Sequence, residues 1–200
     1  MNHLHSLVLV ITLLVGSVSV ATAQNFNKGF EAYDAGDYQT ALQEWRPLAD
    51  QGDVDAQYNL ALMYLNGQGV PQDFAEAARW YQLAAEQGFP KAQYNLALMY
   101  HNGQGVPQDY AEAIKWWRLA AEQGFANAQN NLALMYHYGV GAQQSNVMAH
   151  IWYNIASANG QSKAGEWRDE RAGLMTNADI AKAQQMASEC MSSNYQNCGY

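Results

Sequence analysis

A repeat of 36 residues limits what this chain can fold into more than any other feature. When Gln51 is aligned with Gln87, the two 36-residue copies are identical at 27 positions. A third copy starts at Gln123 and diverges in its second half, where Trp152 and Gly160 still keep the same spacing. A fixed period in this range is typical of stacked supersecondary units, and a divergent last copy is expected where an array ends.

The first half of each copy has the pattern of a helix. Its apolar residues recur at intervals of three and four, which places them on one face. In the first copy they are Ala56, Leu60, Met63 and Tyr64. The stretch 66–71, Asn-Gly-Gln-Gly-Val-Pro, follows and supplies helix stop signals.

The second half of each copy predicts a second helix. Asp73 stands three residues before Glu76, as Asp109 does before Glu112, and this spacing predicts a capping box in which both carboxylates bind backbone N–H groups. A wide apolar face follows, with Gly88 where a left-handed C-terminal cap is expected. That face comprises Phe74, Ala77, Trp80, Tyr81, Ala84 and Ala85. Each copy is therefore predicted to be an antiparallel helical hairpin.

One hairpin cannot bury both of its faces, so neighbouring hairpins must stack. Trp80, Trp116 and Trp152 recur every 36 residues and are expected to fill equivalent positions in successive layers. The near identity of the copies follows from this packing, because each copy presents the same surface to the next. The sequence thus predicts an all-α fold, an α-solenoid of stacked antiparallel helix hairpins.

The recurring residues resemble a known family. The pattern AxxNLALMYxNGxGVPQDxAEAxxWxxxAAEQG is similar to the Sel-one-like repeat (SLR), a relative of the tetratricopeptide repeat with a Gly-x-Gly-Val signature between its helices. That signature occupies 67–70 and 103–106, whereas the third copy has Gly-Val-Gly-Ala at 139–142. With the segments before and after the repeats, the sequence predicts about ten helices in five hairpins, and the resemblance implies that they form a short right-handed superhelix. It also implies adaptor roles in envelope complexes and signalling.

The repeats divide the rest of the chain into segments. Residues 53–160 hold three 36-residue SLR units, and residues 24–52 have the pattern of one tetratricopeptide-like N-terminal hairpin. Residues 161–200 are expected to form a C-terminal capping hairpin, with helices over 162–175 and 176–190, and a disulfide tail.

Residues 1–23 have the layout of a secretory signal peptide. Leu7 to Val15 is almost continuously apolar, and small residues precede a cleavage site expected before Gln24. A membrane anchor is the alternative, but the run from Leu7 to Val20 is shorter than the roughly 20 residues of a spanning helix. The mature chain is therefore expected to be a periplasmic or secreted protein of the bacterial envelope, with no stable membrane insertion after signal cleavage.

The two cysteines of the chain, Cys190 and Cys198, lie eight residues apart near its end. In an exported protein such a pair predicts a disulfide that ties the tail to the last helix. Free thiols or a redox role are the alternatives, although the sequence has no Cys-x-x-Cys motif.

The sequence lacks the usual signatures of catalysis, cofactor binding and nucleic-acid binding. It contains no HExxH, Ser-x-x-Lys or Gly-x-Ser-x-Gly motif, and its glycine loops are explained as helix caps. His101 and His137 share one repeat position, but a zinc site needs three or four ligands, so neither a metal nor another cofactor is predicted. A net charge of -8 argues against a nucleic-acid partner.

Helical geometry locates a candidate binding face on the first helix of each copy. At about 100° per residue, positions 58, 62 and 65 lie opposite the buried Leu60. A solvated helix face would normally be charged here, whereas these positions are aromatic, aliphatic or neutral polar. Over three copies they are Tyr58, Leu62, Leu65, Tyr94, Leu98, His101, Asn130, Leu134 and His137. Since first helices line the concave side of such solenoids, we expect a groove that binds a peptide or helix of a partner.

Two questions about this face stay open in the sequence. The nine residues are equally compatible with partial burial against the neighbouring layer, because stacked helices use more than one stripe. The neutral polar residues beside them could donate hydrogen bonds to a ligand or bridge adjacent helices. These are Gln57, Gln93, Asn59 and Asn95.

The predicted function is binding without catalysis. We expect an exported helical scaffold that presents a preformed concave surface to a protein or peptide. One alternative is a secreted hydrolase, since some secreted SLR relatives bind penicillin or hydrolyse β-lactams. The other is a structural spacer that associates with itself through the groove.

Overall fold

The computed structural model describes residues 25–196 and residue 198, so the segment expected to be a signal peptide lies outside the described residues. The chain divides into two compact units, Met1–Trp80 and Tyr81–Tyr200, and the boundary falls inside one helix, α4 (Phe74–Glu86). All regular secondary structure in the described residues is helical. The all-α prediction is confirmed.

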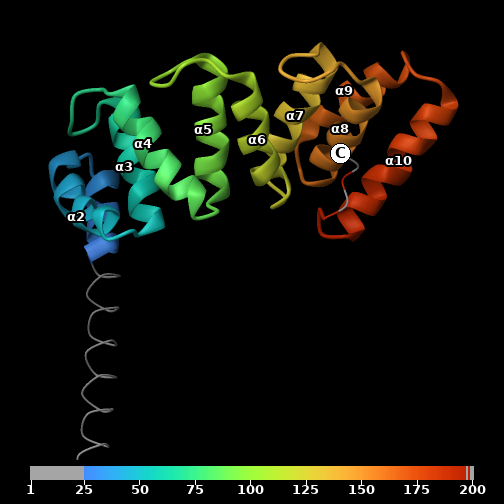
Figure 1. Ribbon diagram of the computed structural model, residues 1–200. Coiled ribbons are helices and arrows are strands. Elements are labelled where there is room, and N and C mark those ends of the chain that lie inside the picture. The colour runs from blue at the N-terminus through green and yellow to red at the C-terminus, as the bar shows by residue number, and fades with distance from the viewer. Residues whose placement is uncertain (1–24, 197, 199–200) are drawn as a thin grey trace, which may run out of the picture. The chain divides into compact units, whose positions relative to one another are not determined.

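The first unit is built from three helices and the start of a fourth, which are coloured blue to green in Figure 1. They are a helix over residues 25–34, α2 (Tyr38–Asp50), α3 (Val54–Asn66) and the first turns of α4. α2 packs on α3, and the carboxylates of Asp37 and Asp53 cap the N-termini of these two helices.

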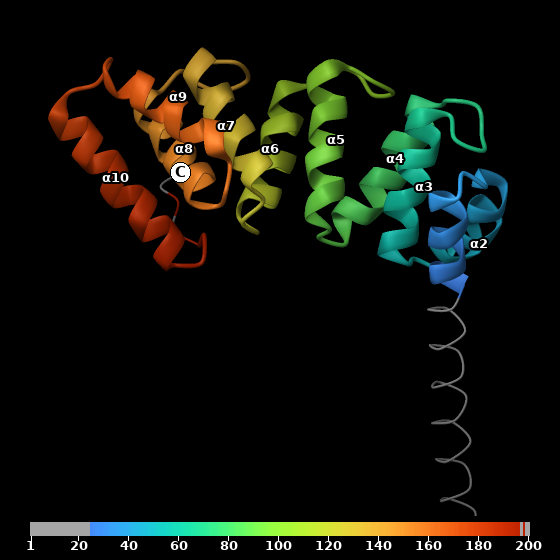
Figure 2. The ribbon, with the colours of Figure 1, turned by 180° about the vertical axis from the view of Figure 1, so that it is seen from behind.

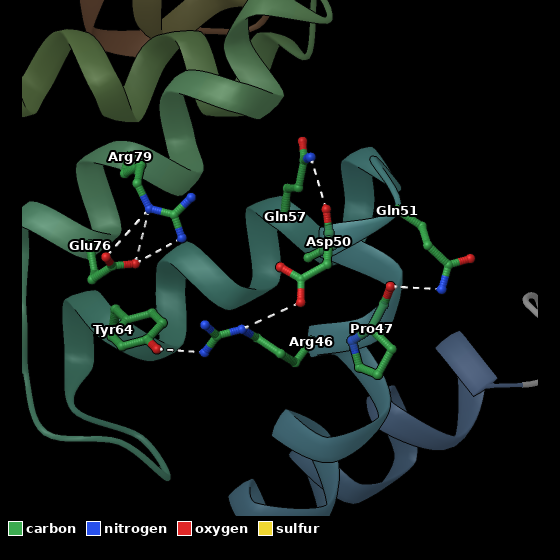
Figure 3. A network of polar contacts seen from close by, with 9 residues as sticks. Arg46, Pro47, Asp50, Gln51, Gln57, Tyr64, Glu76 and Arg79 are labelled. Carbon is green, nitrogen blue, oxygen red and sulfur yellow. Dashed lines mark hydrogen bonds and ion pairs between the residues drawn. The ribbon is translucent and has the colours of Figure 1, made fainter.

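Polar contacts join α2 to α3 in this unit (Figure 3). Arg46 on α2 donates a hydrogen bond of 3.0 Å to the hydroxyl of Tyr64 on α3 and pairs with Asp50 at 3.8 Å. Arg46 also lies over the ring of Trp80, 5.8 Å from its centroid. The guanidinium therefore connects three helices of the unit.

The second unit contains the remaining helices, which Figures 1 and 2 show from opposite sides. They are α5 (Pro90–Asn102), α6 (Tyr110–Ala121), α7 (Ala126–Tyr138), α8 (Asn146–Ala158), α9 (Ser162–Ala172) and α10 (Asn177–Ser192). α5 packs on α6, α6 on α7 and α7 on α8, while α9 and α10 both pack on α8. With the helix over 25–34, the described residues hold ten helical segments, in agreement with the about ten helices predicted from the sequence.

The helix caps correct one detail of the sequence prediction. Asp109 accepts hydrogen bonds from two early backbone N–H groups of α6, as a capping residue should. Glu112, however, pairs with Lys115 at 3.0 Å, and the N–H of Asp109 donates to the carbonyl of Tyr100. The first copy behaves in the same way. The second half of the predicted capping box was wrong, because the loop brings this N–H back to the preceding helix.

The recurring tryptophans are buried, as their spacing predicts. Trp80, Trp116 and Trp152 are 2%, 8% and 0% exposed. The alanines beside them, such as Ala84 and Ala120, are fully buried. Small residues at these positions let the backbones of neighbouring helices approach closely, so the large indole rings fill the remaining space.

Close packing explains the second glycine of the loop signature. Gly141 has a φ of +69°, and a Cβ at this position would lie 2.5 Å from the Cβ of Tyr110 at the start of α6. In the first unit, a Cβ at Gly69 would lie 2.8 Å from the carbonyl oxygen of Tyr38. These two loops therefore rest on the second helix of the preceding hairpin, where only glycine fits.

The predicted disulfide is present. It joins Cys190 in the last turns of α10 to Cys198, and both residues are buried. Thr176 caps α10 by accepting a hydrogen bond from the N–H of Asp179, as its sequence position predicts. Within the described part of the chain, no helix has the length and apolar character needed to cross a membrane.

Candidate functional site

The first helices of the second and third repeat copies, α5 and α7, carry almost no charged residues. α7 contains no Lys, Arg, Asp or Glu, and α5 contains only Lys91, in its first turn. α6, by contrast, carries Glu112, Lys115 and Arg118. Since a helix surface that faces only water is usually charged, α5 and α7 present the surface best suited to a neutral or apolar partner.

On α5, Tyr94 and Leu98 are half-buried. The ring of Tyr94 packs on Phe125 at the start of α7, with centroids 5.3 Å apart. Burial raises the pKa of Tyr94, and a hydrogen bond with the side chain of Asn131 opposes this effect. Tyr94 thus connects α5 to α7 and remains partly exposed.

His101 lies in the last turn of α5 against aromatic rings of α6. Its ring centroid is 5.4 Å from that of Tyr110 and 5.5 Å from that of Trp117. Its Nδ1 lies 3.0 Å from Oδ1 of Asn102. No group of three or more His, Cys, Asp or Glu side chains in the described residues could hold a metal ion.

On α7 the predicted face is more deeply buried. Leu134 is half-buried, whereas Asn130 and His137 are 7% and 8% exposed. Neither Oδ1 of Asn130 nor Nδ1 of His137 has a hydrogen-bond partner among the described residues. The third copy therefore offers less accessible surface at these positions than the second.

In the first unit, the predicted face lies on α3. Tyr58, Leu62 and Leu65 are all half-buried. The nine residues are thus partly or fully buried, and their role in binding stays a prediction.

A buried glutamine near the start of each first helix bridges to the preceding helix. The side-chain Nε2 groups of Gln57, Gln93 and Gln129 donate to the carbonyls of Ala49, Ala85 and Ala121 at 3.1, 3.1 and 3.0 Å. Gln57 is among the residues drawn in Figure 3. Because all three side chains are buried, these amides hold the hairpins together, which decides the question that the sequence left open for Gln57 and Gln93.

Sequence reasoning missed an open hollow of about 600 Å³ in the second unit. Its wall includes Trp116 and Leu119 of α6, together with Gln93 and Gln123. Leu119 is 38% exposed, which is high for a large apolar side chain. The only sequence signal for this site is the 36-residue register, which relates each of these residues to a counterpart in the next copy.

Comparison with known families identifies the repeats. A family model described as Sel1 repeat matches residues 54–89, 90–125 and 126–161, which together make up more than half of the chain. The chain belongs to the Sel1 repeat family. Each match begins within one residue of a first helix and ends just before the next, so one Sel1 repeat corresponds to one helical hairpin.

Two solved structures resemble this Sel1 repeat chain. A Sel1 repeat protein from Oxalobacter formigenes is 37% identical with a TM-score of 0.66, and the match covers 70% of this chain and 57% of that one. A protective antigen of uropathogenic Escherichia coli strains, which displays an SLR fold, is 40% identical with a TM-score of 0.70. That match covers 76% of this chain and 34% of the antigen.

Two curated proteins match shorter stretches. DAP3-binding cell death enhancer 1 of Rattus norvegicus is 42% identical over 60 residues, which is 30% of this chain and 12% of that protein. An exopolysaccharide production negative regulator of Rhizobium leguminosarum bv. viciae is 39% identical over 56 residues, which is 28% of this chain and 21% of the regulator. The similarity to these relatives thus covers only a small part of their length.

Two histidines of the third Sel1 repeat should make the stability of the second unit depend on pH. His150 is 1% exposed. Its burial is the main cause that lowers its pKa, the positive charge of Arg168 lowers the pKa further, and Asp169 opposes the shift. Burial and then Arg171 lower the pKa of His137. In the folded chain both histidines therefore stay neutral at pH values where the same histidines of the unfolded chain are already protonated. Stability is expected to fall as the pH drops below the ordinary histidine pKa of about 6.5.

Urea denaturation at pH 7.5 and pH 5.5, followed by circular dichroism, measures this effect. The urea concentration at the midpoint of unfolding is expected to be lower at pH 5.5 than at pH 7.5. The His137→Gln, His150→Phe double variant should show a clearly smaller difference between the two pH values. An equal pH dependence in the wild-type chain and the double variant would contradict the assignment to these histidines.

Proposed function

We propose that this chain is a non-catalytic scaffold that binds a protein or peptide partner. The observation that carries the proposal is the uncharged, half-buried face of α5 formed by Tyr94, Leu98 and His101. Repeats of the Sel1 family generally mediate protein interactions. A surface of aromatic and aliphatic side chains gains most from the exclusion of water, so the partner contributes an apolar helix face or an extended segment with apolar side chains.

The proposed place of binding is the bacterial envelope or the medium outside it. The disulfide between Cys190 and Cys198 is of a kind that persists in oxidising compartments. Residues 1–23 add the sequence pattern of an export signal. Both features support a mature chain that meets its partner after export.

Site-specific photocrosslinking in cells of the native organism tests the proposed face. A photoreactive benzoylphenylalanine is placed at Leu98, and in a matched control at Gln82, an exposed residue of the second helix α4. A discrete crosslinked product is expected at position 98 and not at position 82. The product should disappear when Tyr94→Asp is added to the position-98 variant, provided that circular dichroism shows unchanged helicity.

Equal products at both positions would contradict the assignment of binding to this face. A crosslink between two copies of the chain would instead favour the self-associating spacer. The enzymatic alternative is tested with a chromogenic β-lactam and the mature chain. Hydrolysis that persists in the Tyr94→Asp, Leu98→Asp variant would favour a hydrolase over a scaffold.

A further inference from the structure

The hollow of the second unit has a counterpart one repeat further along the chain. Around the hollow lie Gly88, Gln93, Trp116, Leu119 and Gln123. A shift of 36 residues gives Gly124, Gln129, Trp152, Ile155 and Asn159. Each set consists of a glycine, two amides, a tryptophan and a branched aliphatic residue, so the two sites are chemically alike.

The counterpart is filled by Tyr195 from the C-terminal tail. A Cβ at Gly124 would lie 3.4 Å from Cε2 and 3.5 Å from the hydroxyl oxygen of Tyr195, so the tyrosine ring lies over this glycine. A Cβ at Gly88 would meet none of the described atoms within 4 Å. The same position is therefore occupied in one repeat and open in the other.

The burial of the apolar residues follows the same contrast. Trp152 and Ile155 are both 0% exposed, whereas Trp116 is 8% and Leu119 is 38% exposed. Leu119 is thus a large apolar side chain that is exposed to water, whereas Ile155 at the same repeat position is fully buried. Covering it would remove apolar surface from water, which favours binding.

The open hollow also holds a group that can accept a hydrogen bond from a hydroxyl. At the filled site, Asn159 donates to Gln129 at 2.9 Å, and its two side-chain polar atoms lie 2.8 and 3.1 Å from the hydroxyl of Tyr195. Gln123 makes the equivalent bond to Gln93 at 2.9 Å. Oε1 of Gln123 accepts no hydrogen bond from the described residues, so it is available to a phenol.

The tail holds its tyrosine in this position despite a backbone cost. Asn194 and Tyr195 have φ values of 52° and 65°, in the left-handed region that residues other than glycine rarely adopt. The disulfide between Cys190 and Cys198 closes the loop that contains them. The contacts of the seated tyrosine are therefore strong enough, with the disulfide, to offset an unfavourable backbone.

We propose that the open hollow binds a tyrosine side chain of a partner polypeptide in the way that its counterpart binds Tyr195. The ring lies over Gly88 and against Trp116 and Leu119, and the hydroxyl bonds to Gln123. This site differs from the uncharged face of α5 around Leu98, so its failure would leave the function proposed above untouched.

The charge of the hollow specifies the partner further. Glu86 and Glu122 are among its lining residues, and no Lys, Arg or His is. At the filled counterpart, Ala158 replaces Glu122. The open hollow is therefore the more acidic of the two and suits a segment with a basic residue beside the tyrosine.

A cyclic peptide provides the probe. It has the sequence of residues 189–198 with Gln196→Lys, which places a basic residue beside the tyrosine, and it is closed by its disulfide as in the native tail. A matched peptide has alanine in place of the tyrosine. Titrated into the full mature chain labelled with ¹⁵N, the tyrosine peptide is expected to shift the Gly88 amide and the Trp116 indole signals. It should bind about tenfold more tightly than the alanine peptide, and equal affinities would overturn the proposal.

Surface variants locate the binding. Leu119→Glu is expected to abolish it, whereas Leu174→Glu, at another exposed leucine of the second unit, leaves it unchanged. With a third peptide that has phenylalanine in place of the tyrosine, Gln123→Leu should reduce the preference for tyrosine over phenylalanine by about fivefold, because the hydroxyl loses its partner. Circular dichroism checks that the variants fold. Unchanged binding to Leu119→Glu would place the peptide elsewhere and overturn the assignment.

A further variant tests the equivalence of the two sites. Tyr195→Ala empties the counterpart and is expected to create a second peptide site that shifts the Gly124 amide. A folded Tyr195→Ala variant with only one site would contradict the equivalence. Binding that occurs only after Tyr200→Ala would show that the chain's own terminal residue fills the hollow, and the partner proposal would then be wrong.

Discussion

Substitution of Gly141 by alanine is expected to destabilise the second unit by about 3 kcal/mol. Two costs add. The residue has a φ of +69°, and the new Cβ would lie 2.5 Å from Cβ and 3.0 Å from the carbonyl oxygen of Tyr110. These atoms belong to or adjoin the backbone of α6, so they cannot move aside as a flexible side chain could. Urea denaturation followed by circular dichroism measures the loss.

Gly160→Ala is the matched control. Gly160 also has a positive φ, of +96°, but a Cβ there would meet none of the described atoms within 4 Å. This variant should therefore lose only the conformational part, about 1 kcal/mol. Similar losses in the two variants would contradict the close contact between the loop and α6.

Trp152→Ala is expected to cost about 3–5 kcal/mol. The indole is 0% exposed and lies on α8, the helix against which α7, α9 and α10 all pack. Its removal leaves a cavity that several helices border, and a small shift of one helix cannot close it. Circular dichroism at increasing urea concentration reports the change in the unfolding midpoint.

Leu174→Ala provides the comparison for this prediction. Leu174 is 65% exposed, in the turn between α9 and α10, and its truncation should change the free energy of unfolding by less than about 0.5 kcal/mol. A loss of less than about 1 kcal/mol in Trp152→Ala would mean that the core around α8 is not packed as described.

The sequence predicts the helices well because the information is local and repeated. The spacing of Leu60 and Met63, and the Gly-x-Gly loops after them, recur at a fixed interval and carry the same meaning each time. The disulfide was also predictable, since the two cysteines are close in the sequence. The capping box failed in part because the acceptor for the N–H of Asp109 is the carbonyl of Tyr100, which only the folded loop brings near.

The candidate sites were less predictable, because burial depends on what packs next. Leu98 and Leu134 hold the same repeat position and are both half-buried. His101 and His137 also share a repeat position, but His101 is half-buried and His137 is buried, because different residues surround each repeat. Leu119 and Ile155 look alike in the sequence. The tail places Tyr195 over Gly124 and fills one of these two sites, while the equivalent position at Gly88 stays open.

The buried glutamines have a consequence for how such a chain can change in length. Gln93 and its acceptor Ala85 stand on opposite sides of a junction between repeats, and so do Gln129 and Ala121. Each copy thus brings a donor near its beginning and an acceptor near its end. A gene duplication that adds 36 codons would create a new junction with a complete pair, without any compensating substitution. An insertion between Ala85 and Gln93 would separate donor from acceptor, so these junctions favour growth of the array by whole copies.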